Sequence, residues 1–90
     1  MKVYIIGIRD NAEEFKKVEY LLKKEGHAPV NPLKVIQALP EEITNADFTI
    51  IAFELIKICD AVYLLEGWEK DLLSRMEFAQ AEREEKVILK

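Results

Sequence analysis

The amino-acid sequence predicts an α/β fold in which a parallel sheet of about four strands carries helices on both faces. Short runs rich in β-branched residues alternate along the chain with longer segments whose apolar residues recur at helical spacing. Strands that alternate with helices usually pair in parallel through right-handed crossovers. The 90 residues suffice for one core of modest size, so we expect a single domain over residues 1–90.

The first strand and the first helix carry the clearest signals. Residues 3–8, VYIIGI, form a nearly continuous apolar run, which is typical of a strand buried on both faces. Asn11 and Glu14 then fit an N-terminal capping pattern. The apolar positions of the following helix recur at helical spacing, and they are Phe15, Val18, Leu21 and Leu22. Gly26 can end this helix in the left-handed conformation.

The middle of the chain predicts a weak strand and two helical segments. A short strand over residues 27–30 should end at Asn31-Pro32, because proline has no N–H for the strand ladder. Residues 33–39 favour a short helical turn. Thr44 and Asp47 mark the start of a longer helix. Its apolar face consists of Phe48, Ile51, Ala52, Leu55 and Cys59.

The last third predicts strand, turn, helix and strand. Asp60 precedes a central strand over residues 61–65, and the chain turns at Glu66, Gly67 and Trp68. The last helix should run from about Glu69 to Glu84. Its expected packing stripe is Leu72, Leu73, Met76 and Ala79. Residues 87–89 then form a closing strand.

Composition and charge exclude several classes of function. A net charge of -4 argues against binding to a nucleic-acid backbone, and no apolar run approaches the ~18 residues of a membrane span. The N-terminus lacks the pattern of a signal peptide. One cysteine, Cys59, and one histidine, His27, argue against a disulfide or a zinc site. We therefore expect a cytoplasmic domain with no metal, no cofactor, no nucleic-acid partner and no membrane partner.

Glu77 is the first candidate for chemistry. It lies at the margin of the apolar stripe of the last helix, where partial desolvation raises the pKa of a carboxyl group. Such a carboxylate can attack an electrophilic carbon and form a covalent intermediate. The alternative is a solvated helix glutamate paired with Lys70 or Arg75.

Other polar residues lie near predicted strand ends and turns. Backbone N–H groups after Gly7, together with Arg9, could hold an anion, although a single glycine is a weak signal and a plain strand-to-helix turn is the more common explanation. The Asn31 amide could bind a sugar or base, or form a turn. Trp68 could stack on a ring or cover the core edge. Asp60 could contact a ligand or fix its turn.

Three segments together resemble one protein family: MKVYIIG, the helix end KKEGHAPVNP, and ICDAVYLLEGWEKDLLSRMEFAQA. They are similar to small phage and bacterial proteins of the nucleoside 2-deoxyribosyltransferase-like superfamily. The resemblance covers nearly the whole chain. Its most specific part is the combination of CDAVYLL, GWE and the later glutamate, followed by alanines.

The resemblance implies a flavodoxin-like three-layer sandwich whose site lies at the carboxyl ends of the strands. In active relatives a helix glutamate attacks the anomeric carbon and displaces the base, and a second base or water resolves the intermediate. The nucleophile position falls on Glu77. The first-strand loop falls on residues 7–9, and the segment that contacts sugar or phosphate falls on residues 67–74, which include Asp71. Relatives are commonly homodimers or larger homo-oligomers.

The chain also departs from this family's pattern. The residue that protonates the departing base falls on Ala52, and Glu54 is turned about 200° away from it around the helix. At the phosphate loop, Asp71 would repel a phosphate and Leu73 would crowd its approach. Ile8 replaces the proline or serine often found after the first glycine.

Three hypotheses of function follow. The first is a nucleoside or nucleotide N-glycosidic enzyme, a deoxyribosyltransferase or an N-hydrolase, with Glu77 as nucleophile and Arg9, Asn31, Asp60 and Trp68 as positioning groups. The rival is a non-catalytic module of the same fold that binds a small ligand or a protein. A third possibility is a structural homo-oligomer built on the apolar helix 48–58. Whether Glu77 faces a solvent-connected cleft beside Gly7 and Gly67 bears directly on the first.

Overall fold

A computed structural model of the protein describes all 90 residues. Its sheet has the order β2-β1-β3-β4, and every pairing in it is parallel. The strands are β1 (Lys2–Ile6), β2 (Ala28–Val30), β3 (Ala61–Leu64) and β4 (Val87–Leu89). The helices are α1 (Ala12–Lys24), α2 (Pro32–Gln37), α3 (Asn45–Ile58), the short 3₁₀ helix η1 (Trp68–Lys70) and α4 (Leu72–Arg83).

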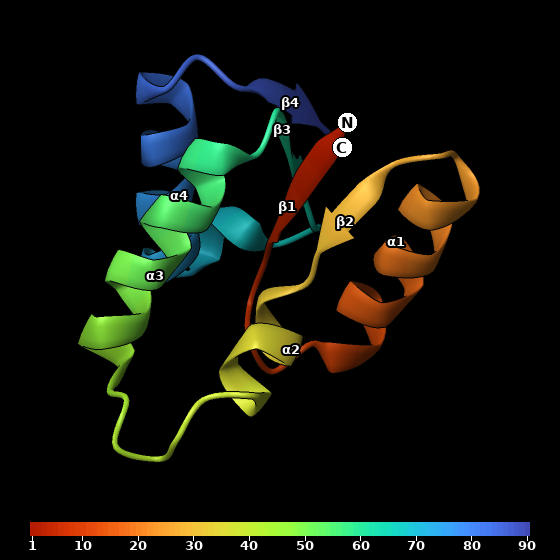
Figure 1. The fold of residues 1–90 in the computed structure, drawn as a ribbon. Coiled ribbons are helices and arrows are strands. Elements are labelled where there is room, and N and C mark those ends of the chain that lie inside the picture. Colours follow the sequence, from red (N-terminus) through yellow and green to blue (C-terminus); the bar gives the residue numbers. More distant parts are fainter.

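Helices cover both faces of this sheet, which confirms the predicted flavodoxin-like three-layer sandwich. Figure 1 shows α1 on one side of the sheet and α3 with α4 on the other. Alternate side chains of β1 point to opposite faces, as the pleat of a strand requires. Val3 and Ile5 pack in the core on the α1 side, whereas Tyr4 and Ile6 pack in the core under α3 and α4.

The strand order places a topological switch point between β1 and β3. From β1 the chain passes through α1 to one neighbour, β2, and after α3 it returns to the other neighbour, β3. In open α/β sheets, ligands bind outside the carboxyl ends of the strands at such a point. The loops that leave these two strands begin at Gly7 and at Leu65, so the fold itself points to them.

Helix α3 begins where the sequence predicts. Thr44 and Asp47 form a reciprocal capping box, in which each side chain accepts a hydrogen bond from the other residue's backbone N–H. Phe48, Ala52 and Ile56 are buried against the sheet. None of the helices in the protein combines the length and the apolar character that a membrane crossing requires.

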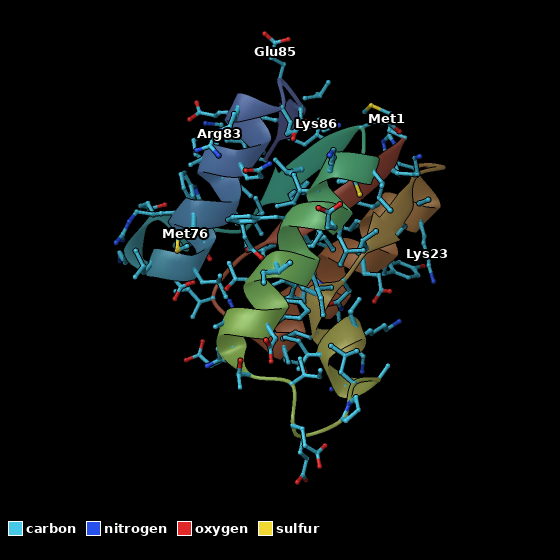
Figure 2. The ribbon with its side chains drawn as sticks, turned by 60° about the vertical axis from the view of Figure 1, so that its left-hand side comes forward. Met1, Lys23, Met76, Arg83, Glu85 and Lys86 are labelled. Atoms are coloured by element: carbon cyan, nitrogen blue, oxygen red, sulfur yellow. The ribbon has the colours of Figure 1, made fainter.

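The last helix differs from the prediction in its start and in its buried face. Gly67, with a φ of 86°, leads into η1, and Asp71 caps a separate helix that begins at Leu72 rather than at Glu69. Leu72 is 64% exposed, and Figure 2 shows Met76 on the outer side of α4. The buried residues are Ser74, Glu77 and Ala81. The small side chains of Ser74 and Ala81 let the helix approach its neighbours closely, and this orientation turns Glu77 inward.

Candidate active site

Three polar side chains meet at the switch point, on the side of the sheet that α3 and α4 cover. Tyr4 comes from β1, Arg9 from the loop after β1, and Glu77 from the middle of α4. The pleat of β1 turns Tyr4 toward α4, and the loop then carries Arg9 over the same face. Glu77 receives hydrogen bonds from both of the other residues.

Glu77 is fully buried, and its two carboxylate oxygens have different surroundings. The Tyr4 hydroxyl donates to Oε2 at 2.6 Å, and Arg9 Nη2 donates to the same oxygen at 2.5 Å. The other oxygen, Oε1, is buried and has no hydrogen-bond partner. A buried carboxylate oxygen without a partner is uncommon, because its desolvation is not offset. The carboxylate is therefore held through one oxygen and leaves the other free.

Burial determines the protonation tendencies of this group of residues. Desolvation raises the pKa of Glu77 above its usual value, although the Arg9 charge and the Tyr4 hydrogen bond act in the opposite direction. Desolvation, followed by the nearby Glu77 charge, raises the pKa of Tyr4 well above its usual value. Tyr4 therefore remains a neutral phenol and donates its proton toward Glu77.

Arg9 is held over Glu77 by contacts on several sides. Its Nη1 donates to the Gly7 carbonyl at 3.3 Å. Its Cζ atom lies 5.9 Å from the centroid of the Phe15 ring and 5.6 Å from that of Phe48, within the range of cation–π attraction. The Arg9 side chain nevertheless stays 20% exposed. It therefore bridges the buried carboxylate and the surface.

Gly7 permits this loop to leave β1 where it does. A Cβ atom on Gly7 would lie 2.6 Å from Leu65 Cδ1, closer than real Cβ contacts. Any larger residue would push the β1 loop away from the end of β3. Gly7 thus acts through close backbone packing, and its carbonyl also accepts from Arg9.

A surface cavity of about 600 Å³ lies on the outer side of Arg9. Its polar lining comprises Arg9, Asp10, Asn45, Thr49 and Asp71. Glu77 is not among its lining residues, although Leu73 and Met76 of the same helix are. Arg9 both lines this cavity and contacts Glu77, so its side chain separates the two. In this conformation the carboxylate does not face a solvent-connected cleft.

Asp71 lies at this cavity and caps α4. Its Oδ2 accepts hydrogen bonds from the backbone N–H of Ser74 at 2.9 Å and from the Ser74 hydroxyl at 2.8 Å. The carboxylate therefore occupies the N-terminus of α4, where the helix dipole favours a negative group. Four of the residues singled out in the sequence therefore meet around Arg9. Its side chain contacts Gly7 and Glu77, and it lines the cavity together with Asp71.

The remaining predicted residues lie elsewhere. Gly67 and Trp68 line a separate cavity of about 480 Å³, and the Trp68 ring packs on Phe78 with centroids 4.5 Å apart. Asn31 caps α2 by accepting from the Leu33 N–H. Asp60 precedes β3, at the amino ends of the strands, and accepts from the Lys2 N–H at 2.9 Å.

Sequence reasoning missed Tyr4, the residue that fixes Glu77. A tyrosine within a buried apolar strand reads as a core residue, and its hydroxyl partner lies on α4 near the other end of the chain. A buried Tyr hydroxyl usually needs a polar partner, and this requirement could have identified Tyr4 as a candidate site residue. Ala52, which the sequence resemblance matches to a proton donor, is fully buried in the apolar core beside α4.

The chemical groups at the site are a carboxylate, a phenol and a guanidinium. No group of three or more His, Cys, Asp and Glu side chains gathers in a way that could hold a metal ion. The arrangement can supply a nucleophilic carboxylate oxygen, with a phenol and a cation that stabilise its ionised form.

Comparison with known proteins identifies the family and the fold of the chain. No protein of curated function matches the chain in sequence. Among solved structures, the chain is similar to the CMP N-glycosidase BcmB of Clostridium botulinum, with a TM-score of 0.72 and 16% identity. The match covers 98% of this chain and 66% of that one, and at this identity it shows a shared fold. The family model described as a domain of unknown function, DUF4406, matches residues 1–90, and the chain therefore belongs to the DUF4406 family.

Proposed function

We propose that the protein cleaves the N-glycosidic bond of a nucleoside-type substrate, with Glu77 as the nucleophile. One observation carries this proposal: a fully buried carboxylate at the switch point is held through Oε2 while Oε1 has no partner. The resemblance to nucleoside 2-deoxyribosyltransferase-like proteins and the fold shared with a CMP N-glycosidase support it. The acceptor is either water or a second base.

In the first step, Oε1 of Glu77 attacks the anomeric carbon of the sugar. The C–N bond breaks, its electron pair leaves with the base, and the base takes up a proton from water. A glycosyl ester on Glu77 results. Because the Tyr4 hydroxyl holds Oε2, it orients Oε1 without competing for its lone pairs. Tyr4 is thus a positioning residue in this scheme.

In the second step, the oxygen of water or a nitrogen of another base attacks the same anomeric carbon. The ester C–O bond breaks, its electrons return to the Glu77 carboxylate, and the attacking group loses a proton. Water gives a free sugar, whereas a base gives a new nucleoside. The Arg9 charge and the Tyr4 hydrogen bond favour the returning carboxylate, because both lower the pKa of Glu77.

Access to Glu77 requires the Arg9 side chain to move. Its guanidinium lies between the carboxylate and the cavity of about 600 Å³, which is large enough for a nucleoside. Two carboxylates at the cavity, Asp10 and Asp71, offer the guanidinium alternative partners. Such a move keeps the guanidinium paired but leaves the buried Glu77 carboxylate with Tyr4 as its only partner, so it carries an energetic cost that substrate binding must offset.

Neither Ala52 nor Glu54 of α3 is placed to act as the proton donor. Ala52 is fully buried, and Glu54 lies exposed on another side of α3. General acid catalysis contributes about 10²- to 10⁴-fold, so we expect slow turnover with ordinary nucleosides. Substrates whose base leaves without protonation should react faster, because they do not need a proton donor.

Base release measured by chromatography tests the proposal. The wild type is incubated with purine and pyrimidine nucleosides and 2′-deoxynucleosides, with and without a second free base. We expect slow base release or exchange, and a loss of about 10³-fold or more in Glu77→Gln. Intact-mass spectrometry should detect a pentosyl adduct that maps to the Glu77 peptide. Glu82→Gln, an exposed substitution on α4, is the matched control. Equal turnover in wild type and Glu77→Gln would contradict the assignment.

The Arg9 ion pair favours a second candidate, a module that binds a small ligand without turnover. Arg9 occupies the approach to Glu77, and the proton-donor position is alanine. The same incubations distinguish the enzyme from the binding module. A nucleoside that raises the thermal midpoint of unfolding with saturation, without base release or adduct, indicates the binding module.

A further inference from the structure

We infer that the cavity at Arg9 selects an uncharged nucleoside over a nucleoside phosphate, and that Asp71 carries much of this selection. The inference rests on the proposed function and names its substrate class. The structural neighbour is described as acting on CMP, a nucleotide, so the two proteins would differ in what they accept.

The cavity lining has an excess of negative charge. Arg9 is the one basic residue in the lining, and its guanidinium is bound to the Glu77 carboxylate. Asp10 and Asp71 bring two carboxylates to the same cavity. A phosphate entering this space would meet the two carboxylates, and the one cation there is paired with Glu77 in this conformation and with Asp10 or Asp71 once it moves. Desolvating a phosphate under these conditions is unfavourable.

The helix ends near the cavity are also unavailable to an anion. The N–H groups at a helix start often bind phosphate. At α4 the Asp71 carboxylate takes that place, because its Oδ2 accepts from the Ser74 N–H and hydroxyl. At α3 the capping box of Thr44 and Asp47 does the same, and the pKa of Asp47 is lowered chiefly by its hydrogen bond from the Thr44 backbone. Both ends already carry a carboxylate of the chain itself.

The same lining suits a neutral polar ligand. Oδ1 of Asp71 forms no hydrogen bond within the protein, so it can accept from a sugar hydroxyl or a base amino group. Asn45 adds an amide at the cavity wall. Leu73 and Met76, the latter labelled in Figure 2, add apolar surface for a ring or the sugar carbons. A few polar groups on an apolar wall are typical of a small-molecule site.

A paired comparison of 2′-deoxycytidine with its 5′-monophosphate tests the inference. For the wild type we expect kcat/KM to favour the nucleoside by about tenfold or more, since the Asp71 carboxylate in the same cavity repels a phosphate. Asp71→Asn keeps an N-cap acceptor and removes the charge. This variant should raise the ratio of kcat/KM for the monophosphate to kcat/KM for the nucleoside by about tenfold. Glu82→Gln, which removes a charge from the exposed face of α4, should leave the ratio unchanged.

Ligand protection against thermal unfolding gives a readout that does not need turnover. The nucleoside should raise the midpoint of the wild type, whereas the monophosphate and inorganic phosphate should not. Asp71→Ser, which also retains a capping group, supplies a second variant if Asp71→Asn does not fold. A wild-type preference for the monophosphate, or an unchanged ratio in both variants, would overturn the inference while leaving Glu77 chemistry intact. Absence of both protection and base release would instead reject the proposed function as well.

Discussion

At the scale of single residues, the central feature is a carboxylate placed where carboxylates are rarely stable. Glu77 is fully buried, and only Tyr4 and Arg9 offset its desolvation. Desolvation still prevails, so the pKa of Glu77 is raised. Perturbed pKa values cluster at functional sites, although structural ion pairs perturb them too. The unpartnered Oε1 distinguishes Glu77 from a glutamate that is fully engaged in a structural network.

Replacement of Tyr4 by phenylalanine should raise the pKa of Glu77 further, because the Tyr4 hydrogen bond lowers it. The reaction needs the ionised carboxylate, so the acidic limb of the pH–rate profile should move to higher pH. An acid whose folded pKa lies above its unfolded value loses its stabilising contribution as the pH rises through the folded value. The stability deficit of Tyr4→Phe, about 1–3 kcal/mol, should therefore be larger at neutral pH than near pH 4.

Urea unfolding and pH–rate profiles check this expectation together. Tyr20→Phe is the matched control, since Tyr20 is 65% exposed on α1 and far from the site. It should change neither measurement. An acidic limb that stays in place in Tyr4→Phe would show that the hydroxyl does not govern the ionisation of Glu77.

At the scale of elements, the starts of two helices shape the cavity. Asp71 begins α4 and orients the turn that leads to Glu77. The capping box of Thr44 and Asp47 begins α3, whose first two turns supply Asn45 and Thr49 to the cavity wall. Both caps place backbone N–H groups on side-chain acceptors, so the positions of the two helix ends are well defined.

Removal of the α3 cap should lower stability in a graded way. Thr44→Ala loses the acceptor for the Asp47 N–H, and we expect a decrease of about 1 kcal/mol in the free energy of unfolding. Thr44→Ser keeps the acceptor and should restore most of that loss. Urea titration of the three proteins measures the difference. Equal stability of the alanine and serine variants would show that the hydroxyl contributes nothing to the helix start.

At the scale of the whole molecule, the arrangement of layers leaves one helix face without a partner. In Figure 1, α3 lies in the outer layer beside α4. Two large apolar residues of this helix are exposed. Ile50 is 66% exposed and Ile58 is 59% exposed. The predicted homo-oligomer would use this face, as the apolar run 48–58 indicates.

Sedimentation velocity of the wild type and of Ile50→Lys checks this prediction. We expect the wild type to sediment as a dimer or larger species and the lysine variant to shift toward the monomer, because a charge would be buried in the interface. Leu21→Lys, on the exposed side of α1, is the control and should not alter the assembly. A wild type that remains monomeric at all concentrations would remove the homo-oligomer from consideration.

Local patterns predicted the elements well and the orientation of the last helix poorly. The alternation of strands and helices, the start of α3 at Thr44 and the closing strand at residues 87–89 are confirmed. The apolar stripe expected through Leu72 and Met76 was wrong. Helical periodicity marks apolar residues, but α4 packs through small residues and Glu77, and this choice depends on what faces the helix.

The sequence by itself determined the class of fold and the parallel sheet, because periodicity, capping and turn signals act over a few neighbouring residues. The nucleophile assignment to Glu77 came from a family resemblance that spans the chain, and not from these local patterns. The tertiary structure alone decided that Tyr4 and Arg9 meet Glu77, and that Arg9 closes its approach from the cavity. These residues lie near opposite ends of the chain. Contacts over such separations depend on how strands pair and helices pack, and no local pattern encodes them.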